Sequence, residues 1–161
     1  MPAAPLTFDA AYQQELSYVW RTLGRLGVPH ADLSDATHDV FIVVYRLWAE
    51  RDAERPLRPW LFAIARKHAA TRRRKRREEL RDDLDATATP PSDHIERDLV
   101  WRALALLDED RRDAIILHDL DGCTAPEIAA ALDVPLNTIY SRIRLGRADF
   151  VAAVRRLEGA P

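Results

Sequence analysis

The sequence is poor in the residues that would support a disulfide scaffold, a sheet or a membrane span. A single cysteine, Cys123, among 161 residues excludes an internal disulfide and a zinc site built on paired cysteines. Five glycines are few for this length, and no segment shows the apolar–polar alternation of a half-buried strand. No apolar run is long enough to span a bilayer, and the first residues lack the basic and apolar regions of a secretory signal. These absences predict an all-α protein that is located in the cytoplasm and has no membrane partner.

Sequence signals of catalysis are also lacking. Isolated Asp, Glu and His residues occur, but none forms a nucleophile-and-base pair or a cluster of metal ligands with other residues of the sequence. The sequence therefore predicts a protein that is not an enzyme, with no metal site and no cofactor.

Charge of both signs is abundant but unevenly distributed. The 24 Lys and Arg residues nearly balance the 26 Asp and Glu residues, which gives a net charge of −2. Residues 66–77 are strongly basic, however, whereas residues 78–98 are rich in Glu and Asp. A nucleic-acid partner is thus indicated by the segregation of charge and not by the net charge.

Helical periodicity predicts three helices in the first half of the chain. Apolar residues at three- and four-residue steps mark helices that begin near Phe8, around Asp32 to Asp35, and near Trp60. The third helix continues into the basic run. The segment 78–92 is acidic, ends in two prolines and has no hydrophobic face, which is typical of a flexible linker.

Four more helices are predicted after this linker. Asp93 and Glu96 have the spacing of a capping box ahead of the fourth helix, and Asp108 is expected to cap the fifth. The sequence therefore predicts two small helical domains, residues 1–77 and 93–158, on either side of the linker.

Residues 124–150 have the layout of a helix-turn-helix that binds duplex DNA. Thr124 and Glu127 form a capping box at the start of a short helix, and Asp133 begins the turn that ends it. In the longer helix that follows, one face is apolar and the opposite face is polar and basic. The apolar face is formed by Leu136, Ile139, Ile143, Phe150 and Val154. An ordinary helical hairpin with a solvated face is the alternative.

The basic run predicts a second nucleic-acid surface of a different kind. Residues 72–77 are all basic, and positive charge at this density binds phosphate backbones through counterion release. Tyr45, Trp48, Trp60 and Phe62 lie near this run in the sequence or at the end of the preceding helix. Because unpaired bases stack on aromatic rings, the combination favours single-strand binding. The alternative is that the tryptophans are core residues and the arginines a solvated tail.

Four segments, in order, resemble the extracytoplasmic-function sigma factors of bacterial RNA polymerase. Residues 35–48 (DATHDVFIVVYRLW) are similar to the family's helix that docks on the polymerase clamp. Residues 58–70 (RPWLFAIARKHAA) are similar to its helix that engages the minus-ten promoter element. Residues 107–132 and 136–144 (LNTIYSRIR) resemble its helix-turn-helix, whose second helix binds the minus-thirty-five element. The resemblance covers about residues 8–157.

This resemblance implies a sigma factor that binds core RNA polymerase at the clamp and flap, directs it to promoters and promotes strand opening. The first domain would correspond to sigma region 2 and the second to sigma region 4. The implied partners are core polymerase, promoter DNA in duplex and single-stranded form, and an anti-sigma factor. Nucleotide addition would belong to the polymerase.

Residue by residue, the resemblance implies three sets of binding residues. Contact with the minus-thirty-five element is implied for Asn137, Thr138, Tyr140, Ser141, Arg142, Arg144, Leu145 and Arg147. Contact with the minus-ten element is implied for Trp60, Arg66, Lys67, Arg72, Arg73 and Arg74. Contact with polymerase is implied for Asp35, His38, Asp39, Phe41 and Arg46.

Several residues depart from the family's pattern. His38 stands where Gln is usual, and Lys67 replaces an Asn that helps to recognise the minus-ten element in some members. Asp133 occupies a turn position usually given to Gly, where a positive φ is common. Tyr140 and Leu145 stand where many members carry basic side chains. The preferred minus-thirty-five sequence is therefore not inherited from relatives.

Two other functions fit parts of the sequence. A stand-alone helix-turn-helix regulator would use the first domain as a sensor or for dimerisation, and it should bind duplex DNA tightly without polymerase. A nucleic-acid enzyme or RNA-binding protein would use the arginine run, and its activity or RNA affinity should survive deletion of residues 93–161. A sigma factor, in contrast, should need core polymerase for specific DNA binding.

Overall fold

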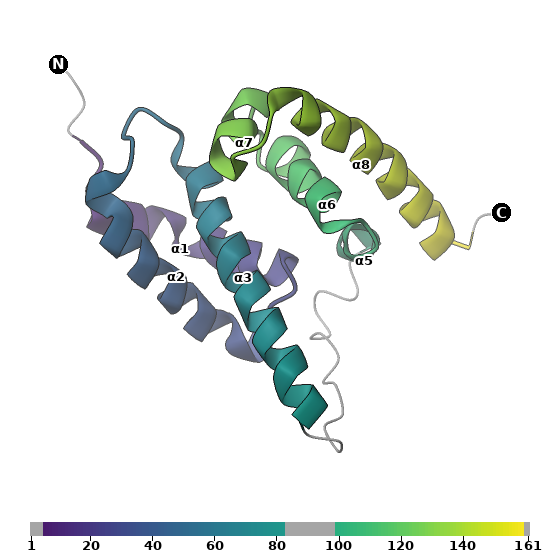
Figure 1. The fold of residues 1–161 in the computed structure, drawn as a ribbon, viewed down its shortest axis with the longest axis horizontal. Helices are drawn as coiled ribbons and strands as arrows, with labels where there is room; N and C mark the ends of the chain where they lie inside the picture. Colours follow the sequence, from purple (N-terminus) through teal and green to yellow (C-terminus); the bar gives the residue numbers. More distant parts are fainter. Residues whose placement is uncertain (1–4, 83–98, 160–161) are drawn as a thin grey trace. The chain divides into compact units, whose positions relative to one another are not determined.

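The computed structural model describes residues 5–82 and 99–159, and the regular elements in these ranges are all helical (Figure 1). This confirms the predicted fold class. The chain divides into two compact units, Met1–Pro91 (unit 1) and Ser92–Pro161 (unit 2). Among the described helices, none is both long and apolar enough to cross a membrane.

Unit 1 is built from three main helices, α1 (Phe8–Arg25), α2 (Leu33–Leu47) and α3 (Leu57–Asp82), with short 3-10 turns η1 (His30–Asp32) and η2 (Trp48–Glu50). The Thr7 hydroxyl caps α1 by accepting a hydrogen bond from the Ala10 N–H at 3.3 Å. Gly27 ends the following turn at φ 86°, a conformation that glycine adopts without strain. The core of unit 1 includes Val19, Leu23, Leu26, Leu33, Val40, Leu61 and Phe62, all at most 1% exposed.

Helix α3 is longer than the sequence predicted. It begins at Leu57, ahead of Trp60, and continues to Asp82, so residues 78–82 are helical and not part of a linker. Arg, Glu and Leu are good helix formers, and Lys75 and Glu79 add an i,i+4 ion pair at 3.9 Å. These local preferences extend the helix without a hydrophobic face. The rest of the predicted linker and the predicted capping box at Asp93 lie outside the described residues.

Unit 2 contains α5 (Leu99–Ala105), α6 (Glu109–Ile115), a π-helical turn η3 (Ile116–Leu120), α7 (Ala125–Leu132) and α8 (Leu136–Leu157). As predicted, the Asp108 carboxylate caps α6, accepting a hydrogen bond from the Asp110 N–H at 3.1 Å. The core is aliphatic and includes Leu104, Ala114, Ile116, Leu117, Ile128 and Ile139, all at most 2% exposed. This core fixes α8 against α6 and α7.

Gly146 marks the closest approach of α8 to α6. A Cβ atom at this position would lie 2.8 Å from Ile115 Cγ1 and 3.1 Å from the Arg111 carbonyl oxygen. Any larger side chain would therefore push the two helices apart. The position of α8 in unit 2 depends on this glycine.

Candidate nucleic-acid and partner interfaces

The helix-turn-helix of unit 2 forms as the sequence predicted. The Thr124 N–H donates to Glu127 Oε2 at 2.7 Å, and the Glu127 N–H donates to Thr124 Oγ1 at 3.4 Å, which completes the capping box of α7. Asp133 ends α7 in the left-handed conformation at φ 53°. The chain then turns into α8 at Leu136.

Helix α8 buries one face and exposes another. Ile139 and Ile143 are buried as predicted, with Gly146 and Ala153 beside them. Leu136 differs from the prediction, because at the first turn of the helix it is 39% exposed. The outward face carries the predicted DNA-binding residues, of which Asn137, Tyr140, Ser141, Arg144 and Arg147 are exposed and Thr138, Arg142 and Leu145 are half-buried.

Two of the predicted DNA-binding arginines on α8 are paired with acidic residues of the same unit. The Arg142 guanidinium donates to the Asp110 carboxylate at 2.6 Å. The Arg147 guanidinium donates through Nε and Nη2 to the Asp119 carboxylate at 2.9 and 2.6 Å. Hydrogen bonding from Arg147 lowers the pKa of Asp119 from 3.8 to about 2. Arg142 and Arg147 therefore hold α8 on the helices behind it.

Other polar residues of this face are not paired in this way. Within unit 2 as described, the side chains of Asn137, Tyr140, Ser141 and Arg144 make no hydrogen bond or ion pair. Their donors and acceptors are available to a ligand. An exposed helix face of this composition suits the edges of base pairs in the major groove of DNA.

The basic side chains of α3 also fall into two groups, because some are exposed to solvent and others form bonds within unit 1. Lys67 and Arg74 are exposed, and Arg66 is half-buried. The Arg72 guanidinium donates a hydrogen bond to Asp39 Oδ2 at 3.0 Å, and the Arg73 guanidinium donates to the Leu26 carbonyl oxygen at 2.7 Å. Arg72 and Arg73 are predicted to contact DNA, but in the structure their guanidinium groups form hydrogen bonds within unit 1.

The sequence carried a signal for this division. Leu61, Ala65 and Ala69 on α3 are buried, and continuing their three- and four-residue steps reaches positions 72 and 73. These arginines extend the inner face of the helix beyond its apolar part. Because residues 72–77 are all basic, no apolar residue marks the inner face in this part of the helix.

Aromatic rings gather where α1 begins, α2 ends and α3 begins. Trp48 and Trp60 are both half-buried, with ring centroids 6.3 Å apart. The Arg51 guanidinium lies 4.6 Å from the Trp48 ring centroid. Tyr45 is 65% exposed, whereas Phe62 is fully buried. Neither alternative from the sequence holds throughout, because the cluster combines core rings with accessible ones.

The predicted polymerase-binding residues of α2 fall into two groups. Asp35, His38 and Arg46 are exposed, and Asp39 is half-buried. Phe41, in contrast, is 3% exposed and packs its ring against Tyr12 at a centroid distance of 4.7 Å. Phe41 therefore lies on the apolar face of α2 that builds the core, and its predicted contact with polymerase stays a prediction.

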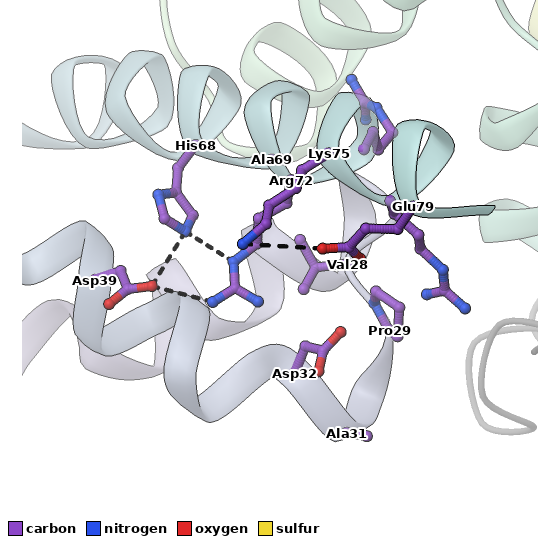
Figure 2. Close-up of a pocket in the computed structure, with 13 residues that line it drawn as sticks. Val28, Pro29, Ala31, Asp32, Asp39, His68, Ala69, Arg72, Lys75 and Glu79 are labelled. Atoms are coloured by element: carbon purple, nitrogen blue, oxygen red, sulfur yellow. Dashed lines mark hydrogen bonds and ion pairs between the residues drawn. The ribbon is translucent and has the colours of Figure 1, made fainter. Parts of the chain in front are cut away.

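A pocket of about 650 Å³ lies between the C-terminal half of α3 and the connection from α1 to α2 (Figure 2). Its wall on α3 includes His68, Arg72 and Arg76, and Asp39 of α2 faces them. The Arg72 guanidinium donates to Asp39 Oδ2 and to His68 Nε2, each at 3.0 Å. Burial, and then the charge of Arg72, lower the pKa of His68, against an opposite effect of Asp39.

Two family models match the chain in the same order as these units. The model for sigma-70 region 2 matches residues 11–79, and the model for sigma-70 region 4 matches residues 97–150. The first covers all of α2 and the basic part of α3. The second covers the helix-turn-helix.

Known sigma factors are similar to most of the chain. The RNA polymerase sigma factor NccH of Alcaligenes xylosoxydans xylosoxydans is 29% identical over 142 residues, which cover 80% of this chain and 76% of that protein. The ECF RNA polymerase sigma-E factor of Escherichia coli K12 is 28% identical over 72% of this chain and 70% of its own. The solved sigma factor RpoE of Bartonella quintana, in complex with the anti-sigma factor NepR, has a similar fold, with a TM-score of 0.76 and 23% identity over 92% of this chain and 96% of its own.

Proposed function

The chain belongs to the sigma-70 family as an extracytoplasmic-function sigma factor, which directs RNA polymerase to promoters for transcription initiation, and we propose how its residues divide this task. Unit 2 binds the minus-thirty-five element through α8. Unit 1 binds core polymerase through α2 and the minus-ten element through α3. A stand-alone regulator is not favoured, because it would not explain the match to sigma-70 region 2 over residues 11–79.

In unit 2 the proposal rests on those polar side chains of the exposed face of α8 that make no hydrogen bond or ion pair among the described residues. Asn137, Ser141 and Arg144 would contact base edges in the major groove, where amide, hydroxyl and guanidinium groups discriminate between base pairs. Thr138 and the free Nη1 of Arg147 would contact phosphates, which position the helix without specifying sequence. Arg142 would act within unit 2, since its guanidinium is held by Asp110.

Tyr140 and Leu145 would set the preference of the minus-thirty-five contact. Tyr140 is 54% exposed on the same face, and Leu145 is half-buried. An apolar side chain at such a position contacts the methyl group of thymine. A preference for thymine opposite Leu145 follows from this placement.

In unit 1 the unpaired strand of the minus-ten element would pass along the start and outer face of α3. Trp60 offers a half-buried ring for stacking, and Arg66, Lys67 and Arg74 offer positive charge to phosphates. Flipping a base out of the stack costs a few kcal/mol, which these contacts must offset. The exposed Tyr45 ring adds a second stacking surface near Trp48.

The exposed face of α2 would bind the polymerase clamp through Asp35, His38, Asp39 and Arg46. Its exposed apolar residues Ile42 (38%) and Leu47 (38%) widen this surface beyond the charged groups. The same surface would be covered by an anti-sigma factor, the kind of partner with which the similar RpoE was solved. The protein would act in the cytoplasm and would catalyse no reaction of its own.

Promoter binding with and without core polymerase tests the proposal. The labelled chain alone should bind promoter duplex weakly and with little sequence preference, and core polymerase should confer tight, sequence-specific binding. Arg144→Ala should weaken specific binding by about 1–3 kcal/mol. Arg155→Ala, which removes an exposed arginine further along α8, is the matched control and should change it little. Tight specific binding without polymerase would instead favour a stand-alone regulator.

A further inference from the structure

The arginines of α3 differ in what they face, although they are adjacent in the sequence. The Arg74 side chain is exposed and makes no hydrogen bond or ion pair within the described part of unit 1. The Arg72 side chain is 32% exposed and lies between α3 and α2. Two residues of the same charge, two positions apart, therefore have different surroundings.

Arg72 makes a three-membered cluster with His68 and Asp39 (Figure 2). Its Nη2 donates to Asp39 Oδ2 at 3.0 Å, and its Nε donates to His68 Nε2 at 3.0 Å. His68 Nε2 also lies 3.6 Å from Asp39 Oδ2. Because the Nε of an arginine can only donate, His68 Nε2 must accept, which places the imidazole proton on Nδ1. Each of the three side chains thus restricts the other two.

The cluster joins α3 to the helix that we propose to bind polymerase. Asp39 lies one residue after His38 on α2, and its side chain is 46% exposed. One carboxylate oxygen, Oδ2, faces Arg72, and the other makes no hydrogen bond or ion pair within the described part of unit 1. A side chain that is already held in one orientation loses less conformational entropy when a partner binds it.

Resting on the proposed function, we propose that Arg72 is a positioning residue for polymerase binding and not a contact for promoter phosphates. It holds the Asp39 carboxylate at the polymerase-binding surface of α2, and His68 fixes the orientation of the Arg72 guanidinium. The phosphate contacts of this helix then belong to outward residues such as Arg74.

The test compares Arg72→Gln with Arg74→Gln, which remove the same charge from the same helix. Two quantities are measured for each full-length variant: the dissociation constant for core polymerase without DNA, and the salt dependence of promoter binding by the assembled holoenzyme. Arg72→Gln should weaken core binding roughly 3- to 10-fold, the effect of one charge-assisted hydrogen bond, and leave the salt slope unchanged. Arg74→Gln should leave core binding unchanged and reduce the salt slope by about one.

A double-mutant cycle covers the case in which Arg72→Gln weakens the folding of unit 1. If Arg72 acts through Asp39, then Asp39→Asn should cost little more core affinity in the Arg72→Gln background, since the interaction is already lost. Arg72→Lys should restore part of the affinity, because an ammonium group can pair with Asp39 but has no guanidinium Nε for His68. Additive effects of the two substitutions would overturn the proposal.

Other results separate this inference from the proposed function. An Arg72→Gln variant with unchanged core affinity and a reduced salt slope would show that Arg72 contacts phosphate, and the inference would fail alone, provided that His38→Ala still weakens core binding. If the unaltered chain did not bind core polymerase, the proposed function itself would fail.

Discussion

The two units of the molecule hold their helices together in different ways. Unit 1 packs aromatic rings against one another, as where Phe8 meets Tyr45 and Trp48 at centroid distances of 5.0 and 5.7 Å. Unit 2 has an aliphatic core, a close helix contact at Gly146, and ion pairs that cross from α8 to the helices behind it. Its crossing pairs are Arg111–Asp149, Arg142–Asp110 and Arg147–Asp119.

This difference fits the binding tasks that we propose for the two units. Helix α8, which we propose to enter the major groove, would need a defined position there, and the close contact and the crossing pairs provide one. Ion pairs at a surface contribute little to stability, typically about 0–1 kcal/mol, so their effect in unit 2 is mainly on orientation. Unit 1 also has ion pairs between helices: Arg58 of α3 pairs with Glu15 of α1 at 2.9 Å, and the Asp39–His68–Arg72 cluster joins α3 to α2, two helices with different proposed partners. Arginine therefore pairs helices with one another in both units, in addition to its proposed contacts with DNA.

The largest expected effect is on the hydrophobic core of unit 1. Phe62 is fully buried, and Phe62→Ala should lower the free energy of unfolding of unit 1 by about 3–5 kcal/mol. Tyr45→Ala, at an aromatic position that is 65% exposed, should have a much smaller effect. Hydrogen exchange of the full chain, followed by mass spectrometry, measures each unit separately. Equal loss of protection in both units would contradict the view that each has its own core.

In unit 2 the corresponding weak point is the close helix contact and not an aromatic residue. Gly146→Val should force α8 away from Ile115 and the Arg111 carbonyl, and overpacking of this kind costs about 1–3 kcal/mol. Ala152→Val, at an exposed position of the same helix, is the control for the lower helix propensity of valine. Exchange protection in α6 and α8 should fall only in the first variant. An equal effect of both variants would mean that the contact at Gly146 is not limiting.

The capping box of α7 should have an intermediate effect. Thr124→Ala removes the hydroxyl that accepts the Glu127 N–H and should destabilise unit 2 by about 1 kcal/mol. Thr124→Ser keeps the hydroxyl and should behave nearly as the unaltered protein in thermal unfolding. Because the capping box sets the start of the helix-turn-helix, the alanine variant should also weaken binding to the minus-thirty-five element.

The smallest effect, on pH dependence, should distinguish the two units. Burial lowers the pKa of His68 below its ordinary 6.5, so an unfolded unit 1 takes up a proton that the folded unit resists. Unit 1 should therefore lose stability as the pH falls below about 6.5. The pKa of Asp119 is lowered from 3.8 to about 2, so its stabilisation of unit 2 persists above pH 3.8 and is lost only as the pH falls toward 2.

Unfolding measured as a function of pH checks this order. His68→Gln should remove the first loss of stability and leave the second, whereas Asp119→Asn should do the reverse. Loss of stability by unit 2 before unit 1, as the pH falls, would contradict the effects attributed to His68 and Asp119.

Local patterns in the sequence predicted the helices of the described residues and the capping box at Thr124, because periodicity and caps depend on neighbours in the chain. The positive φ at Asp133 was indicated instead by the resemblance to the family, which usually has Gly at this turn position. The π-helical turn at Ile116–Leu120 was not predicted, since its apolar residues fit an α-helix equally well. The extension of α3 to Asp82 was missed because a charged helix has no hydrophobic face to reveal it.

The side-chain partners could not be predicted in the same way. Arg142 and Asp110 are 32 positions apart, and Arg72 and Asp39 are 33 positions apart. A long flexible side chain gives no local sign of the helix that it will reach. The sequence therefore predicts which helices bind nucleic acid, but it does not reveal that Arg72, Arg73, Arg142 and Arg147 pair within the protein. The burial of Phe41 was not foreseen for a related reason, since a family motif does not separate its core residues from its contact residues.

Transcription in vitro by purified core polymerase from a library of randomised promoters tests the central claim most directly. With the unaltered chain, transcripts should start from templates enriched in two separate sequence elements. Arg144→Ala should change only the upstream, minus-thirty-five preference and leave the minus-ten preference intact. Transcription no greater than with core polymerase alone, or enrichment of a single element, would contradict the account.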